Sequence, residues 1–151
     1  MGARTLKTVL AVTLAAALMK YVFHKPMFFA CIGAVIAVER TVSSSFQAVV
    51  IRNIGTIVGG LIGIVITSYT QNIIFISLGL IPIIWIHNVI NKTESIVPAA
   101  IVYFAVAYMN TMGSPWEYGI IRILGTLIGT LIGLGINLLI YPPRPEANNI
   151  Q

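Results

Sequence analysis

Long apolar runs separated by short polar or charged stretches dominate the chain. Six runs predict helices, at about residues 6–23, 26–38, 54–69, 73–90, 96–112 and 123–141. A helix needs roughly 20 apolar residues to cross about 30 Å of hydrocarbon. The second run is too short for a full crossing and ends at Glu39 and Arg40. The sixth ends at Pro142 and Pro143, which cannot extend a helix.

Composition places the chain in a membrane. Of its 151 residues, 58% are hydrophobic and 9% are charged, whereas a soluble domain carries about 25% charged residues. A soluble fold and a disordered chain are therefore excluded. The net charge of +5 comes from residues that flank apolar runs, as the positive-inside rule describes. No basic stripe with interleaved aromatic residues indicates nucleic acid, so the lipid bilayer is the expected partner.

The charges also predict an orientation. With six crossings, six Lys and Arg residues fall on one side and three on the other, which favours cytoplasmic termini in a multi-pass membrane protein. An alternative is open for the first segment. Arg4 and Lys7, followed by an alanine-rich stretch, also fit a signal peptide, although Lys20 at the far end fits a membrane helix with snorkelling lysines better.

The chain repeats itself without a gap. Residues 51–63 match residues 121–133 at an offset of 70 residues, and Thr41 and Ser44 upstream match Thr111 and Ser114. The matching pairs within the repeat are Arg52 with Arg122, Gly55 with Gly125, Thr56 with Thr126, Gly59 with Gly129, and Gly63 with Gly133. Two glycine-rich helices that converged would not explain the upstream matches. The sequence predicts one transmembrane domain over residues 1–151, with repeats at about 1–70 and 71–141 and a polar tail at 142–151.

An odd number of segments in each repeat has a topological consequence. If all three segments cross the membrane, the second repeat enters from the opposite side, as in many secondary transporters. We therefore predict an all-α integral membrane fold of six transmembrane segments, arranged as two inverted three-helix repeats. The second and fifth helices are expected to be short or broken, and Gly113, Ser114 and Pro115 mark the break in the second repeat.

Glycines recur every four residues in both copies and form a stripe along each helix. Small residues let membrane helices approach closely, so these positions are predicted to pack helices together. A smooth path for a substrate between helices is the alternative, and the two roles are compatible. The positions are Gly55, Gly59, Gly63, Gly125, Gly129 and Gly133.

The duplicated arginines are the candidate substrate contacts. Arg52 and Arg122 each lie three residues before a glycine stripe, and we predict them at the N-terminal ends of their helices, where an anion is favoured. A guanidinium can hold a carboxylate through two hydrogen bonds, and Thr56 and Thr126 are predicted to contact the same anion. The alternative is an interfacial anchor, or a salt bridge to an acid.

Two acids, Glu39 and Glu117, are the nearest candidates for such a salt bridge, or else carry the protons that drive transport. His87 at the end of the fourth run is expected to be an interfacial polar residue. The single cysteine, Cys31, excludes an intrachain disulfide and a multi-cysteine metal site. No catalytic motif occurs, so neither enzymatic activity nor a metal or cofactor is expected.

Short motifs resemble the bacterial aromatic acid exporter family, which belongs with the fusaric acid resistance proteins. The resemblance is carried by residues 2–8, by Arg52 followed by Gly55, Thr56 and Gly59, and by Asn137 followed by two prolines. It implies a six-helix membrane domain that exports organic anions across the bacterial plasma (inner) membrane. In many members a cytoplasmic domain follows the membrane part, and here it would begin after Gln151 and is either absent or removed.

The combined prediction is a membrane transporter that exports small organic anions, with aromatic carboxylates as the substrate class. Six short helices can scarcely enclose a pathway alone, so a homodimer or larger oligomer is expected. The alternative is a non-transporting membrane scaffold or subunit that packs partner helices through its glycine stripes.

Overall fold

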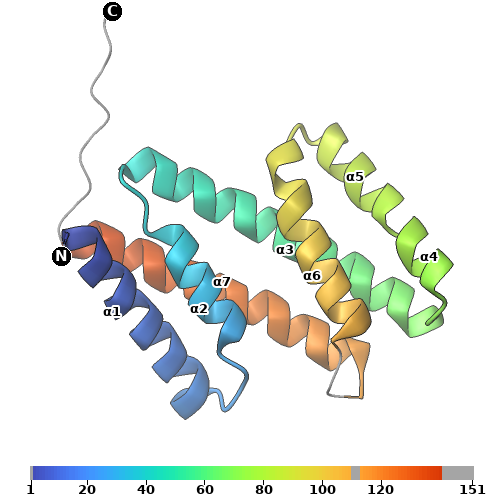
Figure 1. Cartoon of the computed structure of the whole chain (residues 1–151), viewed down its shortest axis with the longest axis horizontal. Helices are drawn as coiled ribbons and strands as arrows, with labels where there is room; N and C mark the ends of the chain where they lie inside the picture. The colour runs from blue at the N-terminus through green and yellow to red at the C-terminus, as the bar shows by residue number, and fades with distance from the viewer. Residues whose placement is uncertain (1, 110–112, 141–151) are drawn as a thin grey trace, which may run out of the picture. The chain divides into compact units, whose positions relative to one another are not determined.

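The computed structural model describes residues 2–109 and 113–140, and these form helices joined by short connections (Figure 1). The predicted stop at Pro142 and Pro143 and the predicted tail 142–151 lie outside the described residues. The elements in chain order are α1 (Ala3–Ala17), the π-helical turn η1 (Leu18–Val22), α2 (Phe28–Ala37), α3 (Val42–Tyr69), α4 (Ile73–Leu78), α5 (Leu80–Val89), the 3₁₀ turn η2 (Thr93–Ser95), α6 (Ile96–Tyr108) and α7 (Pro115–Leu139).

Within the part of the chain that the structure describes, three stretches are long and apolar enough to cross a membrane, namely Arg4–Val22, Val42–Tyr69 and Pro115–Leu139. The shorter apolar helices are Phe28–Ala37, Ile73–Val89 and Thr93–Tyr108. The prediction of an all-helical membrane protein is thereby confirmed at this coarser level. The second and fifth predicted segments correspond to α2 and α6, which have 10 and 13 residues.

The helix that carries the first glycine stripe begins well before the predicted residue 54, at Val42. Thr41 and Ser44 form a capping box, in which the Ser44 backbone N–H donates to Thr41 Oγ1 (3.1 Å) and the Thr41 N–H donates to Ser44 Oγ (3.2 Å). Each side chain thus satisfies a backbone donor at the start of the helix. Residues 42–53, which the apolar pattern leaves outside the predicted helix 54–69, are therefore helical.

The second copy behaves in the same way. α7 begins at Pro115 rather than near residue 123, and proline is favoured at the first helical position because the N–H it lacks would be unpaired there anyway. Arg52 and Arg122 consequently lie well inside α3 and α7. The prediction that they occupy helix N-termini, and the argument for anion binding built on that placement, are wrong.

The fourth predicted segment is interrupted, which the apolar pattern did not indicate. α4 ends at Leu78 and α5 begins at Leu80, on either side of Gly79. Pro82 has no N–H to donate to the Leu78 carbonyl, and its ring crowds that carbonyl. The hydroxyl of Tyr103 on α6 donates to the Ile76 carbonyl beside the break (2.5 Å). A short polar connection precedes this segment, and Asn72 caps α4 there.

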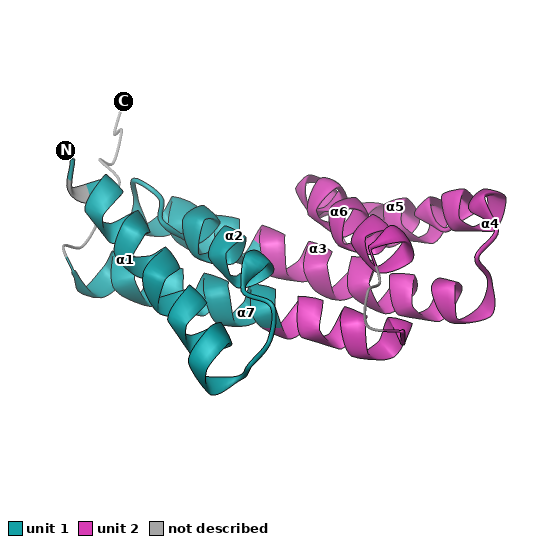
Figure 2. Ribbon diagram, turned by 60° about the horizontal axis from the view of Figure 1, so that its bottom comes forward, with its two compact units in different colours: residues 1–50, 125–151 teal, residues 51–124 magenta. Residues whose placement is uncertain are grey.

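Two compact units make up the structure, unit 1 from Met1–Val50 and Gly125–Gln151 and unit 2 from Ile51–Leu124 (Figure 2). They do not coincide with the two sequence repeats, because α3 and α7 each contribute residues to both units.

In unit 1, the glycines of α7 pack against the backbone of α2. A Cβ at Gly129 would overlap the carbonyl oxygen of Ala30, and one at Gly133 would lie 2.6 Å from that of Ala34. Two helices can approach this closely only where a residue has no side chain. Residues of α1 complete this core, including Ala11 and Ala15.

In unit 2, the glycines of α3 pack in the same manner on α6. A Cβ at Gly59 would overlap the carbonyl oxygen of Ala99, and one at Gly63 would lie 3.1 Å from Cβ of Val106. Both duplicated stripes therefore lie against a short helix within their own unit. In unit 2 this contact fixes the register of α3 on α6, and with it the position of the polar residues described next.

Candidate functional site

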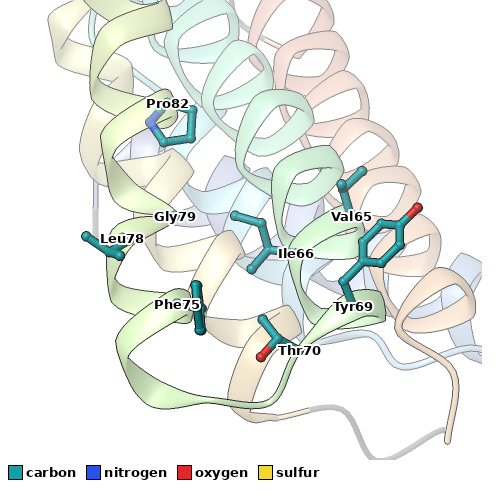
Figure 3. Close-up of a pocket in the computed structure, with 8 residues that line it drawn as sticks. All are labelled: Val65, Ile66, Tyr69, Thr70, Phe75, Leu78, Gly79 and Pro82. Atoms are coloured by element: carbon teal, nitrogen blue, oxygen red, sulfur yellow. The ribbon is translucent and has the colours of Figure 1, made fainter.

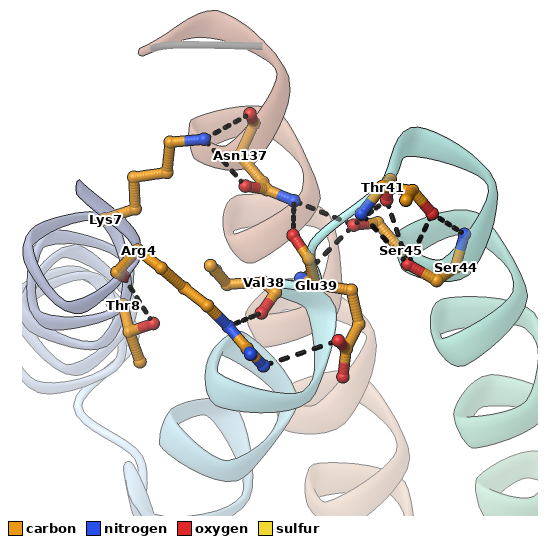
Figure 4. Close-up of polar contacts among 9 residues, drawn as sticks. All are labelled: Arg4, Lys7, Thr8, Val38, Glu39, Thr41, Ser44, Ser45 and Asn137. Carbon is orange, nitrogen blue, oxygen red and sulfur yellow. Dashed lines mark hydrogen bonds and ion pairs between the residues drawn. The ribbon is translucent and has the colours of Figure 1, made fainter. Parts of the chain in front are cut away.

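One polar cluster lies in unit 1 and joins α1, α2, the start of α3 and the end of α7 (Figure 4). Lys7, which is 6% exposed, donates to Asn137 Oδ1 (3.0 Å) and to the Asn137 carbonyl (3.3 Å). The Asn137 amide nitrogen donates in turn to the Glu39 carbonyl (3.0 Å) and to Ser45 Oγ (2.7 Å). Because its buried polar groups have partners, this cluster holds unit 1 together without needing a ligand.

Glu39 forms an ion pair within the same unit. Its Oε2 lies 3.4 Å from the guanidinium of Arg4, whose Nε also donates to the Val38 carbonyl (3.3 Å). Both charged side chains remain partly exposed, at 50% for Arg4 and 37% for Glu39. The structure thus gives Glu39 an ion-pair partner different from the two duplicated arginines.

A second polar cluster lies in unit 2, and it differs from the first because its buried atoms lack partners. We call it the unit 2 polar cluster. Four of its side-chain atoms are buried without a hydrogen-bond partner among the described residues: Nε of Arg52, Oγ1 of Thr56, Nε2 of His87 and Oγ of Ser95. Leaving a buried polar atom unpaired costs roughly 1–3 kcal/mol. Such atoms mark a place where something other than the protein completes the bonding.

Close packing of α3 on α6 brings three of these residues to one place. A Cβ at Gly55 would lie 2.6 Å from the Ser95 carbonyl oxygen and 2.9 Å from the Ala99 nitrogen. Arg52 and Thr56 flank Gly55 and are four residues apart, so they share one side of α3. Arg52 is only 5% exposed, and Thr56 and Ser95 are fully buried.

The N-terminus of α6 forms the other wall. Ser95 precedes the first residue of α6, yet its side chain makes no capping bond. A capping hydroxyl accepts the N–H of the second or third helical residue, and the third residue of α6 is Pro98, which has no N–H to donate. The Ser95 hydroxyl is therefore available beside the positive end of a 13-residue helix.

His87 lies close by, at the end of α5. Its carbonyl accepts from the Lys92 N–H (2.9 Å), and the Lys92 carbonyl accepts from the Ser95 N–H (3.0 Å). The ring Nδ1 is 2.7 Å from the Ile83 carbonyl. Nδ1 must therefore carry a hydrogen, and in the neutral ring Nε2 is an acceptor. The side chain of His87 is fully buried within the protein, and its position at the membrane interface stays a prediction.

The other residues predicted to contact the substrate or to form salt bridges are Arg122, Thr126 and Glu117. Arg122 is half-buried in unit 2, with its guanidinium carbon 4.3 Å from the ring centre of Tyr118 one turn earlier, a cation–π contact. Thr126 belongs to unit 1, where its hydroxyl is buried without a partner. Glu117 is exposed. Arg52 and Thr56 lie in one unit, whereas the boundary between the two units falls between Arg122 and Thr126 on α7.

An open groove of about 320 Å³ lies elsewhere in unit 2, between the end of α3 and the α4–α5 break (Figure 3). Its walls are almost entirely apolar, with hydroxyls only from Tyr69 and Thr70. Arg52 is 17 residues before Tyr69 on the same helix, so the groove is roughly 25 Å along α3 from the unit 2 polar cluster. This groove suits an apolar chain rather than an anion. Among the described residues, no group of His, Cys, Asp and Glu side chains could hold a metal ion.

Comparison with known proteins decides the family. The family model described as "Aromatic acid exporter family member 1" matches residues 1–140. This chain belongs to the aromatic acid exporter family. It is also 28% identical over 157 residues to the UPF0421 protein YgaE of Bacillus subtilis (strain 168), in an alignment that covers all of this chain and 43% of that protein. The chain thus spans less than half the length of that relative. No solved structure matches.

The resemblance to the exporter family is therefore confirmed. Ser95 and His87, however, were not among the candidate substrate contacts predicted from the sequence. Ser95 ends the polar stretch 91–95, His87 lies near the end of an apolar run, and the burial of both arises only when α5 and α6 pack. One local signal was available for Ser95, because Pro98, three residues later, has no N–H to donate to a capping hydroxyl.

Proposed function

We propose that this chain is the membrane domain of a transporter that exports small organic anions, with aromatic carboxylates as the substrate class. Membership of the aromatic acid exporter family supports a membrane transporter. The proposal assigns substrate contacts to Arg52 and Thr56, with Arg122 and Thr126 as their counterparts in the second repeat.

One observation carries the proposal. Arg52 lies on a 28-residue apolar helix, is 5% exposed, and has no hydrogen-bond partner for its Nε. A buried guanidinium without an acid is costly, and charges retained within membrane helices mark substrate or ion pathways. An anionic substrate would offset that cost on binding, and a hydrophobic ring beside the carboxylate suits the apolar surroundings.

Reconstitution tests the function directly. Purified full chain in liposomes should move radiolabelled benzoate faster than protein-free liposomes, at an alkaline pH where the freely permeant uncharged acid is scarce. Unlabelled benzoate should compete, and neutral benzyl alcohol should not. Flux equal to that of protein-free liposomes would contradict the proposal and leave the scaffold alternative.

We further propose that the two repeats have inverted topology with cytoplasmic termini. The 70-residue repeat and the three apolar segments in each half support this arrangement. Gln47 and Glu117 occupy equivalent positions, near the starts of α3 and α7, and both are exposed. In a Cys31→Ala background, cysteines at these two positions should be labelled by impermeant maleimide from opposite sides of the membrane. Labelling from the same side would contradict the inverted repeat.

A second copy of the chain is the expected partner in the membrane, because six short helices enclose little space alone. Crosslinking in native membranes, with mass measurement in mild detergent, should show a dimer or larger species. A monomer that still transports benzoate would contradict this part of the proposal.

A further inference from the structure

The structure assigns a carboxylate-binding role to Ser95 and the N-terminus of α6, which together with Arg52 and Thr56 form one anion site inside unit 2. This inference rests on the proposed function, which it deepens by adding a wall of the site that the repeat does not contain. The residue equivalent to Arg52 in the second copy, Arg122, stacks on Tyr118 instead.

The unpartnered side-chain atoms of the site are hydrogen-bond donors, as binding of a carboxylate requires. Among the unpartnered atoms, Arg52 Nε, Thr56 Oγ1 and Ser95 Oγ are all able to donate. Other hydroxyls on the same helix behave differently, since Thr67 donates to the Gly63 carbonyl and Ser68 to the Ile64 carbonyl, both at 2.7 Å. Threonine and serine in helices commonly make such bonds. Thr56 does not, so its hydroxyl is free to face a ligand.

Electrostatics points to an anion rather than a neutral ligand. The positive end of the α6 dipole lies where α6 meets the α3 turn that holds Arg52, and two positive groups at one buried place repel each other unless a negative charge lies between them. A carboxylate would accept from the guanidinium and the hydroxyls together.

His87 does not have the chemistry to bind the anion. In the neutral ring its Nε2 is an acceptor, since Nδ1 donates to the Ile83 carbonyl. The carboxylate is therefore bound by the three donors, and His87 is not assigned to it.

Measuring benzoate binding and thermal stability together tests this assignment. Both are measured on the full chain in detergent, and titration calorimetry gives the benzoate affinity. Thr56→Val and Ser95→Ala should each weaken benzoate binding by about tenfold, the effect expected for a hydrogen bond to a charged group. Neither variant should lower the melting temperature, because each removes a hydroxyl that bonds nothing in the protein. Thr67→Val is the matched control, which should lower the melting temperature and leave benzoate affinity unchanged.

Three results would overturn the assignment: no benzoate binding by the parent chain, parent-like affinity in both Thr56→Val and Ser95→Ala, or benzyl alcohol binding as tightly as benzoate. Benzoate flux in liposomes separates this failure from that of the proposed function. Flux that persists while both variants bind benzoate normally overturns the site alone, whereas absence of flux in the parent chain overturns both the site and the proposed function.

Discussion

Lys7 near the start of the chain donates hydrogen bonds to both the side-chain and the main-chain oxygen of Asn137, near the end of α7. The contact joins residues 130 positions apart in sequence, and Asn137 extends it to the start of α3 through Ser45. The polar network around Asn137 in unit 1 thus has hydrogen-bond partners for its buried groups. In the unit 2 polar cluster, four buried side-chain atoms have no partner among the described residues. We interpret the first as structural and the second as functional.

Asn137→Ala should destabilise the protein, because it leaves the buried amine of Lys7 and the hydroxyl of Ser45 without this partner. The expected loss is about 2 kcal/mol in the free energy of unfolding, measured by SDS titration in mixed micelles. Thr8→Ala is the control, since that exposed hydroxyl bonds only the Arg4 carbonyl of its own helix. Equal stability of the two variants would show that the Lys7–Asn137 contact contributes nothing.

Two glycines of the same stripe should respond differently to one added methyl group. Gly129→Ala places a carbon against the Ala30 carbonyl and should cost about 1–3 kcal/mol of unfolding free energy. Gly125→Ala meets nothing closer than 3.7 Å, which is ordinary contact, and should change stability by less than about 0.5 kcal/mol. A stable Gly129→Ala variant would mean that α2 and α7 do not pack as described.

Glu39→Gln should have little effect, because the Arg4–Glu39 ion pair is partly exposed. Solvent screening limits such pairs to less than about 1 kcal/mol, and transport should continue at the parent rate. Benzoate flux in liposomes with and without a proton gradient is the measurement. A variant that folds normally but no longer responds to the gradient would instead assign Glu39 to proton coupling.

Local rules and the repeat predicted much of the fold. Apolar runs gave the helices, and the 70-residue register identified the glycines that the structure places against Ala30 and Ala99. The missed features have local causes that the apolar pattern does not contain. The capping box at Thr41 begins α3 early, and Pro82 divides the fourth segment.

The site was harder to predict than the fold. Arg52 and Thr56 were found because duplication marked them, although the argument from a helix N-terminus was wrong for α3. The relevant N-terminus is that of α6, which reaches Gly55 only through tertiary packing. A single sequence does not show which apolar segments will be neighbours, so Ser95 could not be placed beside Arg52 from its position alone.

The most direct test of the central claim is benzoate flux through liposomes that contain Arg52→Gln, compared with Arg40→Gln at equal amounts of folded protein. Arg40 is exposed and precedes α3, so it controls for the loss of one positive charge. We expect Arg52→Gln to lower flux by about tenfold or more, as loss of a charged hydrogen-bond donor implies, while Arg40→Gln retains the parent rate. Parent-like flux in Arg52→Gln would contradict a role for Arg52 in anion transport.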